Sequence, residues 1–119
     1  MTITLFGIPN CDTVRKARRF LDGLNLGYTF VDMKTTAIDP QLLAAASQAL
    51  GFSKVLNRSS ATFRALSADD QALAASETGA LQLLQRYPTL IKRPLVVAGD
   101  RFLVGFDEAA LRKLSETPA

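Results

Sequence analysis

The sequence predicts an α/β fold: a four-stranded mixed sheet with helices on its faces and a helical insertion between a βαβ unit and a ββα unit. Three observations support this prediction. Strand, helix and strand patterns follow one another within residues 3–32, which is typical of a parallel βαβ unit with a right-handed crossover. Residues 39–88 show helical patterns without a convincing strand, and two short strands and a helix follow.

The first strand runs from Ile3 to Phe6, and the segment from Gly7 to Asn10 breaks it. Cys11 follows at the tip of the turn, and a helical pattern begins at about Thr13. The cysteine therefore lies at a helix N-terminus, where unpaired N–H groups and a partial positive charge favour a thiolate over a thiol. A buried structural cysteine would more naturally fall inside an apolar run, so we favour a functional cysteine.

The first helix has an apolar face at three- and four-residue steps, formed by Val14, Ala17, Phe20, Leu21 and Leu24. Its other positions are basic. We interpret Arg18 and Arg19 as a solvated face, whereas Arg15, one turn beyond Cys11, is placed to face the same anion as the cysteine. The second strand is expected at Tyr28 to Asp32.

The insertion begins with Asp39-Pro40, a typical helix start, and its first helix should end at Gly51. Residues 52–64 are expected to be irregular or to form a short helix. Residues 67–70, Ser-Ala-Asp-Asp, resemble a capping box and predict a helix to about residue 75. Another helix should run from about Thr78 to Arg86. We expect the insertion to pack beside the sheet rather than to form a separate domain.

The last two strands are predicted at Leu95 to Ala98 and Arg101 to Val104, joined by a two-residue Gly-Asp turn. Asp107 is a plausible N-cap for a closing helix that ends near Glu116. This order of elements is the thioredoxin arrangement with a helical insertion.

A second candidate site precedes the third strand at Arg93-Pro94. In a thioredoxin-like sheet this loop passes close to the loop after the first strand, so Arg93 would stand near Cys11. Its guanidinium could hold an oxyanion through two parallel hydrogen bonds, although an ordinary surface arginine is the alternative. Pro94 is a candidate for a cis peptide bond, and Arg58 is a further candidate from the insertion.

The amino-acid composition limits the kinds of function that the chain can have. The 119 residues, 48% hydrophobic and 21% charged, predict one globular domain, 1–119, and we expect a monomer because such a chain can bury its own core. The net charge of +3 is too small to indicate direct nucleic-acid binding. Without histidine, and with one cysteine, the chain offers no His or thiolate metal site. The lone thiol, the absence of a signal-peptide pattern and the absence of a membrane-length apolar run predict a cytoplasmic protein.

Four motifs, in order, cover nearly the whole chain: GIPNCDTVRKAR, GFSKVLNRSSATFRAL, PTLIKRPLVV and FLVGFDEAAL. With them the sequence resembles the arsenate-reductase-like (ArsC/Spx) family, and most closely its YffB-type branch. The resemblance implies a thioredoxin-like fold with a helical insertion, which agrees with the elements predicted above.

The resemblance also implies roles. Cys11 would be the nucleophile, with Asn10, Thr13 and Arg15 around it. Arg93, Arg58 and the neighbouring cis Pro94 would bind an oxyanion or a glutathione carboxylate. In related arsenate reductases the thiolate attacks arsenate, glutathione then attacks the arsenic, and glutaredoxin resolves the mixed disulfide. Glutathione is therefore the expected co-substrate and glutaredoxin a possible partner, with no cofactor bound.

Two departures from the family pattern leave two hypotheses. Gly105 stands where arsenate reductases carry a third arginine, which argues against arsenate as the substrate. Val14 stands where Spx regulators often have the second cysteine of a Cys-x-x-Cys switch. We favour a glutathione-dependent thiol reductase. The alternative is a non-enzymatic, Spx-like regulator that binds RNA polymerase, in which Gly51 matches a contact glycine or simply stops a helix.

Overall fold

The computed structural model describes residues 2–116, and the chain divides into two compact units. The first unit takes residues 2–32 and 93–116, and the second takes residues 33–92. The second unit contains the predicted insertion, 39–88. That this insertion forms no separate domain stays a prediction.

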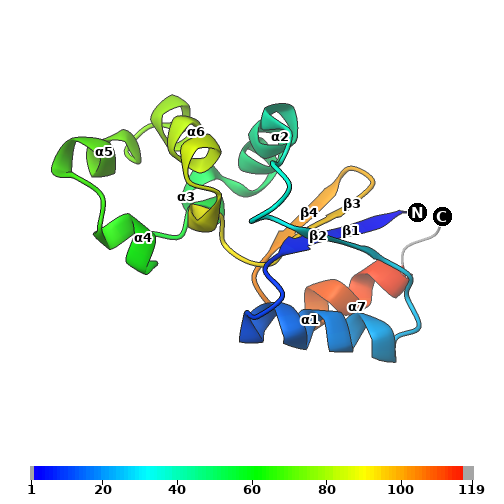
Figure 1. The fold of residues 1–119 in the computed structure, drawn as a ribbon. Coiled ribbons are helices and arrows are strands. Elements are labelled where there is room, and N and C mark those ends of the chain that lie inside the picture. The colour runs from blue at the N-terminus through cyan, green and yellow to red at the C-terminus, as the bar shows by residue number, and fades with distance from the viewer. Residues whose placement is uncertain (1, 117–119) are drawn as a thin grey trace. The chain divides into compact units, whose positions relative to one another are not determined.

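The first unit is a four-stranded mixed sheet with two helices (Figure 1). Its elements are β1 (Ile3–Gly7), α1 (Asp12–Gly23), β2 (Thr29–Asp32), β3 (Leu95–Ala98), β4 (Arg101–Val104) and α7 (Glu108–Glu116). The strand order is β2-β1-β3-β4, with β1 and β2 parallel and the pairs β1–β3 and β3–β4 antiparallel. This topology confirms the predicted thioredoxin-like fold.

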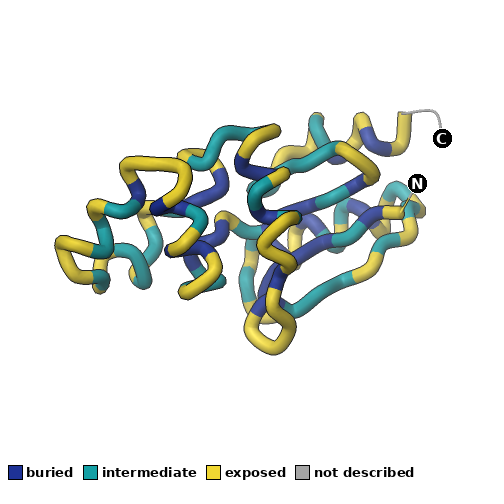
Figure 2. Tube along the Cα trace, turned by 90° about the horizontal axis from the view of Figure 1, so that it is seen from above, coloured by how far each residue is buried: buried dark blue, intermediate teal, exposed yellow. Residues whose placement is uncertain are grey.

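The core of the first unit lies between one face of the sheet and the helices α1 and α7, which run side by side (Figure 1). Because side chains alternate along a strand, Ile3 and Leu5 of β1 share this face with Val96 and Ala98 of β3. The apolar face of α1, predicted from its periodicity, covers them. The buried stretches of β1 and β3 stand out in the burial view (Figure 2).

The second unit is helical, as predicted. Its elements are α2 (Pro40–Leu50), α3 (Phe52–Val55), α4 (Ala61–Arg64), α5 (Ala68–Leu73), α6 (Glu77–Arg86) and the 3-10 helix η1 (Pro88–Leu90). The Asp39 carboxylate caps α2 by accepting from the N–H of Gln41 at 2.9 Å, and Gly51 ends that helix with φ +92°. Ser67 Oγ caps α5 by accepting from the N–H of Asp70 at 3.1 Å. The local helix signals therefore located these boundaries to within a residue or two.

Backbone contacts between distant segments close the second unit. Leu56 and Ile91 form an isolated antiparallel bridge, and the N–H of Lys92 donates to the carbonyl oxygen of Val55 at 2.7 Å. Gly79 of α6 packs so closely on α5 that an added Cβ would clash with the carbonyl oxygen of Leu73. Glycine at this position thus allows the two helices to meet.

Candidate active site

Cys11 lies in the turn between β1 and α1, at the N-cap position of the helix, one residue before its first residue Asp12. Its N–H donates to the carbonyl oxygen of Ile8 at 3.2 Å, and its carbonyl oxygen accepts from the N–H of Arg15 at 2.9 Å. The half-buried side chain is a free thiol that packs on the core of the first unit and makes no capping hydrogen bond. The sulfur is therefore held at the positive end of a 12-residue helix, where an anion is stabilised.

Gly7 fixes how closely α1 approaches the strand that precedes it. A Cβ added at Gly7 would lie 2.7 and 2.9 Å from the two methyl carbons of Val14, which is fully buried. A side chain at residue 7 would therefore push the first turn of α1 away from β1. The position of Cys11 depends on this close contact.

The loop that carries Arg93 and Pro94 lies at the same end of the sheet as Cys11. Leu95, the first residue of β3, pairs with Phe6 near the end of β1, so the loop before β3 and the turn after β1 are neighbours. The predicted proximity of these two loops is confirmed. The Arg93–Pro94 peptide bond is cis, also as predicted. Arg93 is half-buried, and its role as an oxyanion ligand stays a prediction.

Gly105 completes this end of the sheet after β4. Its N–H donates to the carbonyl oxygen of Pro94 at 3.0 Å, and its φ is +77°. Glycine adopts this left-handed conformation freely, whereas a residue with a side chain would cost about 1–3 kcal/mol there. The backbone itself therefore disfavours an arginine at the position where arsenate reductases are expected to carry their third one.

The other predicted residues of the first unit surround the N-terminal end of α1. Asn10 is exposed in the turn, and Thr13 is half-buried in the first helical turn. Arg15 is exposed and forms an ion pair with Asp12 at 3.2 Å, one turn back toward Cys11. An exposed pair of this kind contributes about 0–1 kcal/mol, so Arg15 can readily exchange Asp12 for another anion. The binding roles of all three stay predictions.

Arg58 belongs to the second unit, in the turn between α3 and α4. Its exposed side chain donates from Nη2 to the carbonyl oxygen of Ala74, just past α5, at 2.8 Å. The turn itself is ordered by Asn57, whose side-chain oxygen accepts from the N–H of Ser59 at 3.0 Å. A shared site of Arg58 and Cys11 stays a prediction.

Arg18 differs from its prediction. Arg19 is exposed, as expected for a solvated face, but Arg18 is half-buried beside β2. Its guanidinium lies 4.2 Å from the ring centroid of Phe30, and its Nε donates to the Tyr28 hydroxyl at 3.1 Å. Helical periodicity shows only that Arg18 lies off the apolar face of α1, so it could not predict this tertiary contact. The aromatic residues of the second strand, Tyr28 and Phe30, were the one sequence feature that could have suggested a partner for Arg18.

Neither a metal centre nor a membrane span is found in the part of the chain that the structure describes. Within residues 2–116, His, Cys, Asp and Glu side chains form no group of three that could hold a metal ion. Over the same residues, no helix is long and apolar enough to cross a bilayer.

Comparisons with known proteins support the motif assignment. The profile of the ArsC family matches residues 6–114. A solved YffB protein is 39% identical, with a TM-score of 0.89 over 93% of this chain and 96% of that one. The solution structure of an arsenate reductase (ArsC) related protein from Brucella melitensis is 33% identical, with a TM-score of 0.72 over 95% and 93%.

A regulator is also among the relatives. The global transcriptional regulator Spx of Streptococcus pneumoniae is 28% identical over 92% of this chain and 83% of that protein. The match to arsenate-reductase-related structures on one side and to Spx on the other agrees with the resemblance carried by the four motifs. With its profile matched over residues 6–114, the chain belongs to the ArsC family.

Proposed function

We propose that this protein is a glutathione-dependent thiol reductase in which Cys11 is the nucleophile. The observation that carries the proposal is the position of Cys11, a free thiol at the N-cap of α1 and at the same end of the sheet as the Arg93 loop. A helix N-terminus favours the thiolate, which is the reactive form of cysteine, and in this proposal the Arg93 guanidinium does so as well. They would also hold the negative charge of an oxyanion substrate.

The chemistry follows that of the arsenate-reductase relatives. With an arsenate-like substrate, the Cys11 thiolate bonds to arsenic and displaces an oxygen, which leaves as water. Glutathione then attacks the arsenic and displaces a second oxygen as water. The sulfurs of Cys11 and glutathione join in a mixed disulfide that stays on the protein, while arsenic gains two electrons, is released and takes up water to give arsenite. Another thiol, such as that of glutaredoxin, reduces the mixed disulfide. External thiols are required because the sequence has no second cysteine.

The arginines would set the substrate range. In this proposal Arg93 binds the oxyanion or a glutathione carboxylate through bidentate hydrogen bonds. Gly105 supplies no third cation and its backbone conformation suits glycine, so fewer charges surround the substrate than in an arsenate reductase. We therefore expect a less highly charged oxidised substrate, such as a glutathione mixed disulfide, to be turned over better than arsenate.

The test compares the rate of Cys11 alkylation by iodoacetamide at neutral pH in wild type, Arg93→Ala and Arg101→Ala. Arg101 is a matched control because it is also half-buried in the first unit but pairs with Ala98 at the other end of β4. That end lies about 10 Å away along the strand, roughly a Debye length at 0.1 M salt. We expect Arg93→Ala to slow alkylation, because it removes a positive charge from the loop beside Cys11, and Arg101→Ala to leave the rate unchanged.

The second part of the test is the formation of a glutathione adduct. Wild type incubated with oxidised glutathione should form a mixed disulfide at Cys11, which reduced glutathione reverses, and Cys11→Ser should not form it. Equal alkylation rates in all three proteins, together with no glutathione adduct, would exclude the reductase.

The relationship to Spx favours a second candidate function, binding to RNA polymerase without turnover. What supports it is the 28% identity to Spx along most of both chains. Val14 lies in the core, and the sequence has no second cysteine, so an intramolecular disulfide switch would not operate here. Affinity capture of polymerase subunits by wild type and Cys11→Ser alike, with no glutathione-dependent turnover, would identify the regulator.

A further inference from the structure

A basic groove runs along α1 and β2 of the first unit. It consists of two adjoining shallow depressions of about 510 and 400 Å³. Both are lined by Arg18, Asp22 and Tyr28, and the lining also includes Arg15, Arg19 and Phe30. We call this surface the α1–β2 groove. Apart from Arg15, its lining residues have no part in the chemistry proposed for Cys11.

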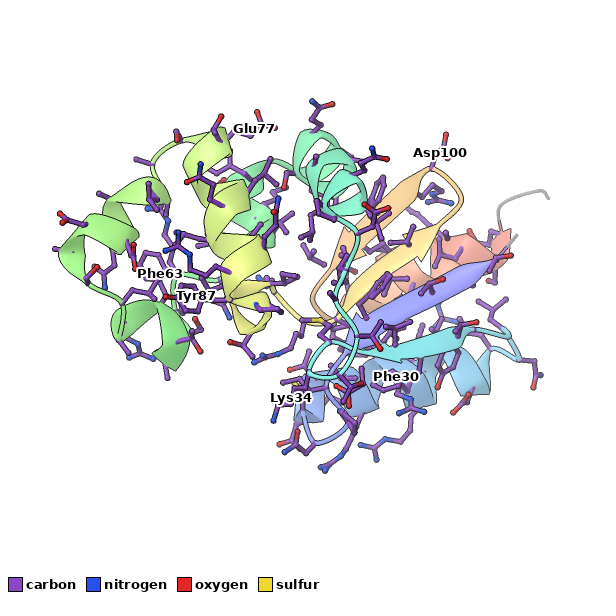
Figure 3. All side chains as sticks on the ribbon, turned by 45° about the horizontal axis from the view of Figure 1, so that its top comes forward. Phe30, Lys34, Phe63, Glu77, Tyr87 and Asp100 are labelled. Carbon is purple, nitrogen blue, oxygen red and sulfur yellow. The ribbon has the colours of Figure 1, made fainter. Side chains whose placement is uncertain are left out.

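Arg18 is held ready for an anion on the floor of this groove. Phe30, which lies on the side of β2 that faces α1 (Figure 3), stacks against the Arg18 guanidinium at 4.2 Å. The Tyr28 hydroxyl accepts from Nε of Arg18 at 3.1 Å, which fixes the plane of the group. A guanidinium fixed in this way presents its terminal N–H groups as a fork that matches a carboxylate. Because the side chain is already ordered, binding costs little further entropy.

Arg15 and Arg19 extend the positive charge along the helix. Together with Arg18 they occupy positions i, i+3 and i+4, so all three lie on one side of α1. Arg15 is paired with the highly exposed Asp12, whose side chain is 90% accessible, and such a pair is easily exchanged. Three guanidinium groups thus line the groove against the single carboxylate of Asp22, which makes it complementary to an acidic ligand.

The observations favour a polypeptide over a nucleic acid. Single-stranded nucleic acids stack their bases on open aromatic faces, but Arg18 already covers Phe30. Asp22 lines both depressions and would repel a continuous phosphate backbone. A polypeptide can place carboxylates opposite the arginines and a neutral or basic group opposite Asp22. We propose that the α1–β2 groove binds an acidic segment of a partner protein.

The test measures fluorescence anisotropy of a labelled peptide of about 12 residues that alternates Glu with Ser. Wild type is titrated at about 0.15 M NaCl, where diffuse surface attraction is screened. The matched variants are Arg18→Gln, Arg18→Lys and Arg112→Gln. Arg112 is a control in the same unit, because it also lies over an aromatic ring, that of Phe20, but outside the groove.

We expect Arg18→Gln to weaken peptide binding about tenfold, and Arg18→Lys to weaken it nearly as much, because lysine keeps the charge but loses the fork. Arg112→Gln should change binding less than about twofold. If Arg18→Gln and Arg112→Gln reduce the affinity for the peptide equally, the peptide is held by diffuse electrostatic attraction and the proposed site is wrong. Tighter binding of a thymidine oligonucleotide of the same length would overturn the choice of a polypeptide.

A titration of the wild-type protein tests the same site without relying on variants that could misfold. Backbone amide chemical shifts, followed during titration with the Glu-Ser peptide, should change in α1 and β2 and stay constant in α7. Changes that centre on α7, or no changes at all, would contradict the proposal. Repeating the titration with Cys11→Ser separates it from the proposed reductase, because peptide binding should persist when the thiol is absent.

Discussion

Replacing Gly7 by alanine is the sharpest test of how the fold positions Cys11. The added methyl group would lie 2.7 and 2.9 Å from the two methyl carbons of Val14. Favourable carbon–carbon contacts begin at about 3.5 Å, so α1 or β1 would have to move by several tenths of an ångström. Val14 cannot swing aside, because it is fully buried and its β-branched side chain prefers one rotamer in a helix.

The magnitude follows from two opposing effects. Overpacking of this kind costs about 1–3 kcal/mol, and replacing glycine returns about 0.4–1 kcal/mol through the unfolded chain. Gly7→Ala should therefore destabilise the protein by about 1–2 kcal/mol. Val14→Ala alone should cost about 2 kcal/mol as a cavity. In the double variant only the Val14 Cβ remains near the new methyl, at 3.4 Å, so the two losses should partly cancel.

Urea unfolding of wild type, both single variants and the double variant gives the coupling energy, which we expect to be about 1 kcal/mol in favour of the pair. Tyr28 lies in the first unit and Tyr87 in the second, so tyrosine fluorescence and circular dichroism together report on both units. The alkylation rate of Cys11 should change in Gly7→Ala and recover in the double variant. Strict additivity, or a Gly7→Ala protein as stable as wild type, would refute the close contact.

Three further substitutions test packing and capping. Gly79→Ala should destabilise the protein by about 1–3 kcal/mol because its Cβ would clash with the Leu73 carbonyl oxygen. Gly23→Ala, with open space around it, should be neutral or stabilise by about 0.5 kcal/mol. If urea unfolding shows that both variants are destabilised, or that both are stabilised, the predicted difference between them is wrong. Asp107→Ala should cost about 1 kcal/mol because it removes the acceptor for the N–H of Ala110 at 3.1 Å. Unchanged helix content and stability would show that this cap is dispensable.

Local patterns in the sequence were enough to locate most elements. The strand at residues 3–6 and the break after it placed Cys11 at a helix start, and the structure has it at the N-cap. Asp39-Pro40, the Ser67 cap and the turn before β4 also lie where they were predicted. These signals work because caps, turns and periodicity depend on residues within about four positions of one another.

Contacts between residues far apart in the chain were decided by the tertiary structure. The pairing of Phe6 with Leu95 brings the Arg93 loop to the end of the sheet that holds Cys11, and resemblance to a known fold was needed to anticipate it. Stacking of Arg18 on Phe30 and bonding of Arg58 to Ala74 have no local signature. The periodicity of a helix predicts which of its faces is polar, but the residues that this face contacts depend on tertiary packing. The sequence by itself determined the elements and the position of Cys11 at a helix N-terminus, and the tertiary structure determined the neighbours of the arginines.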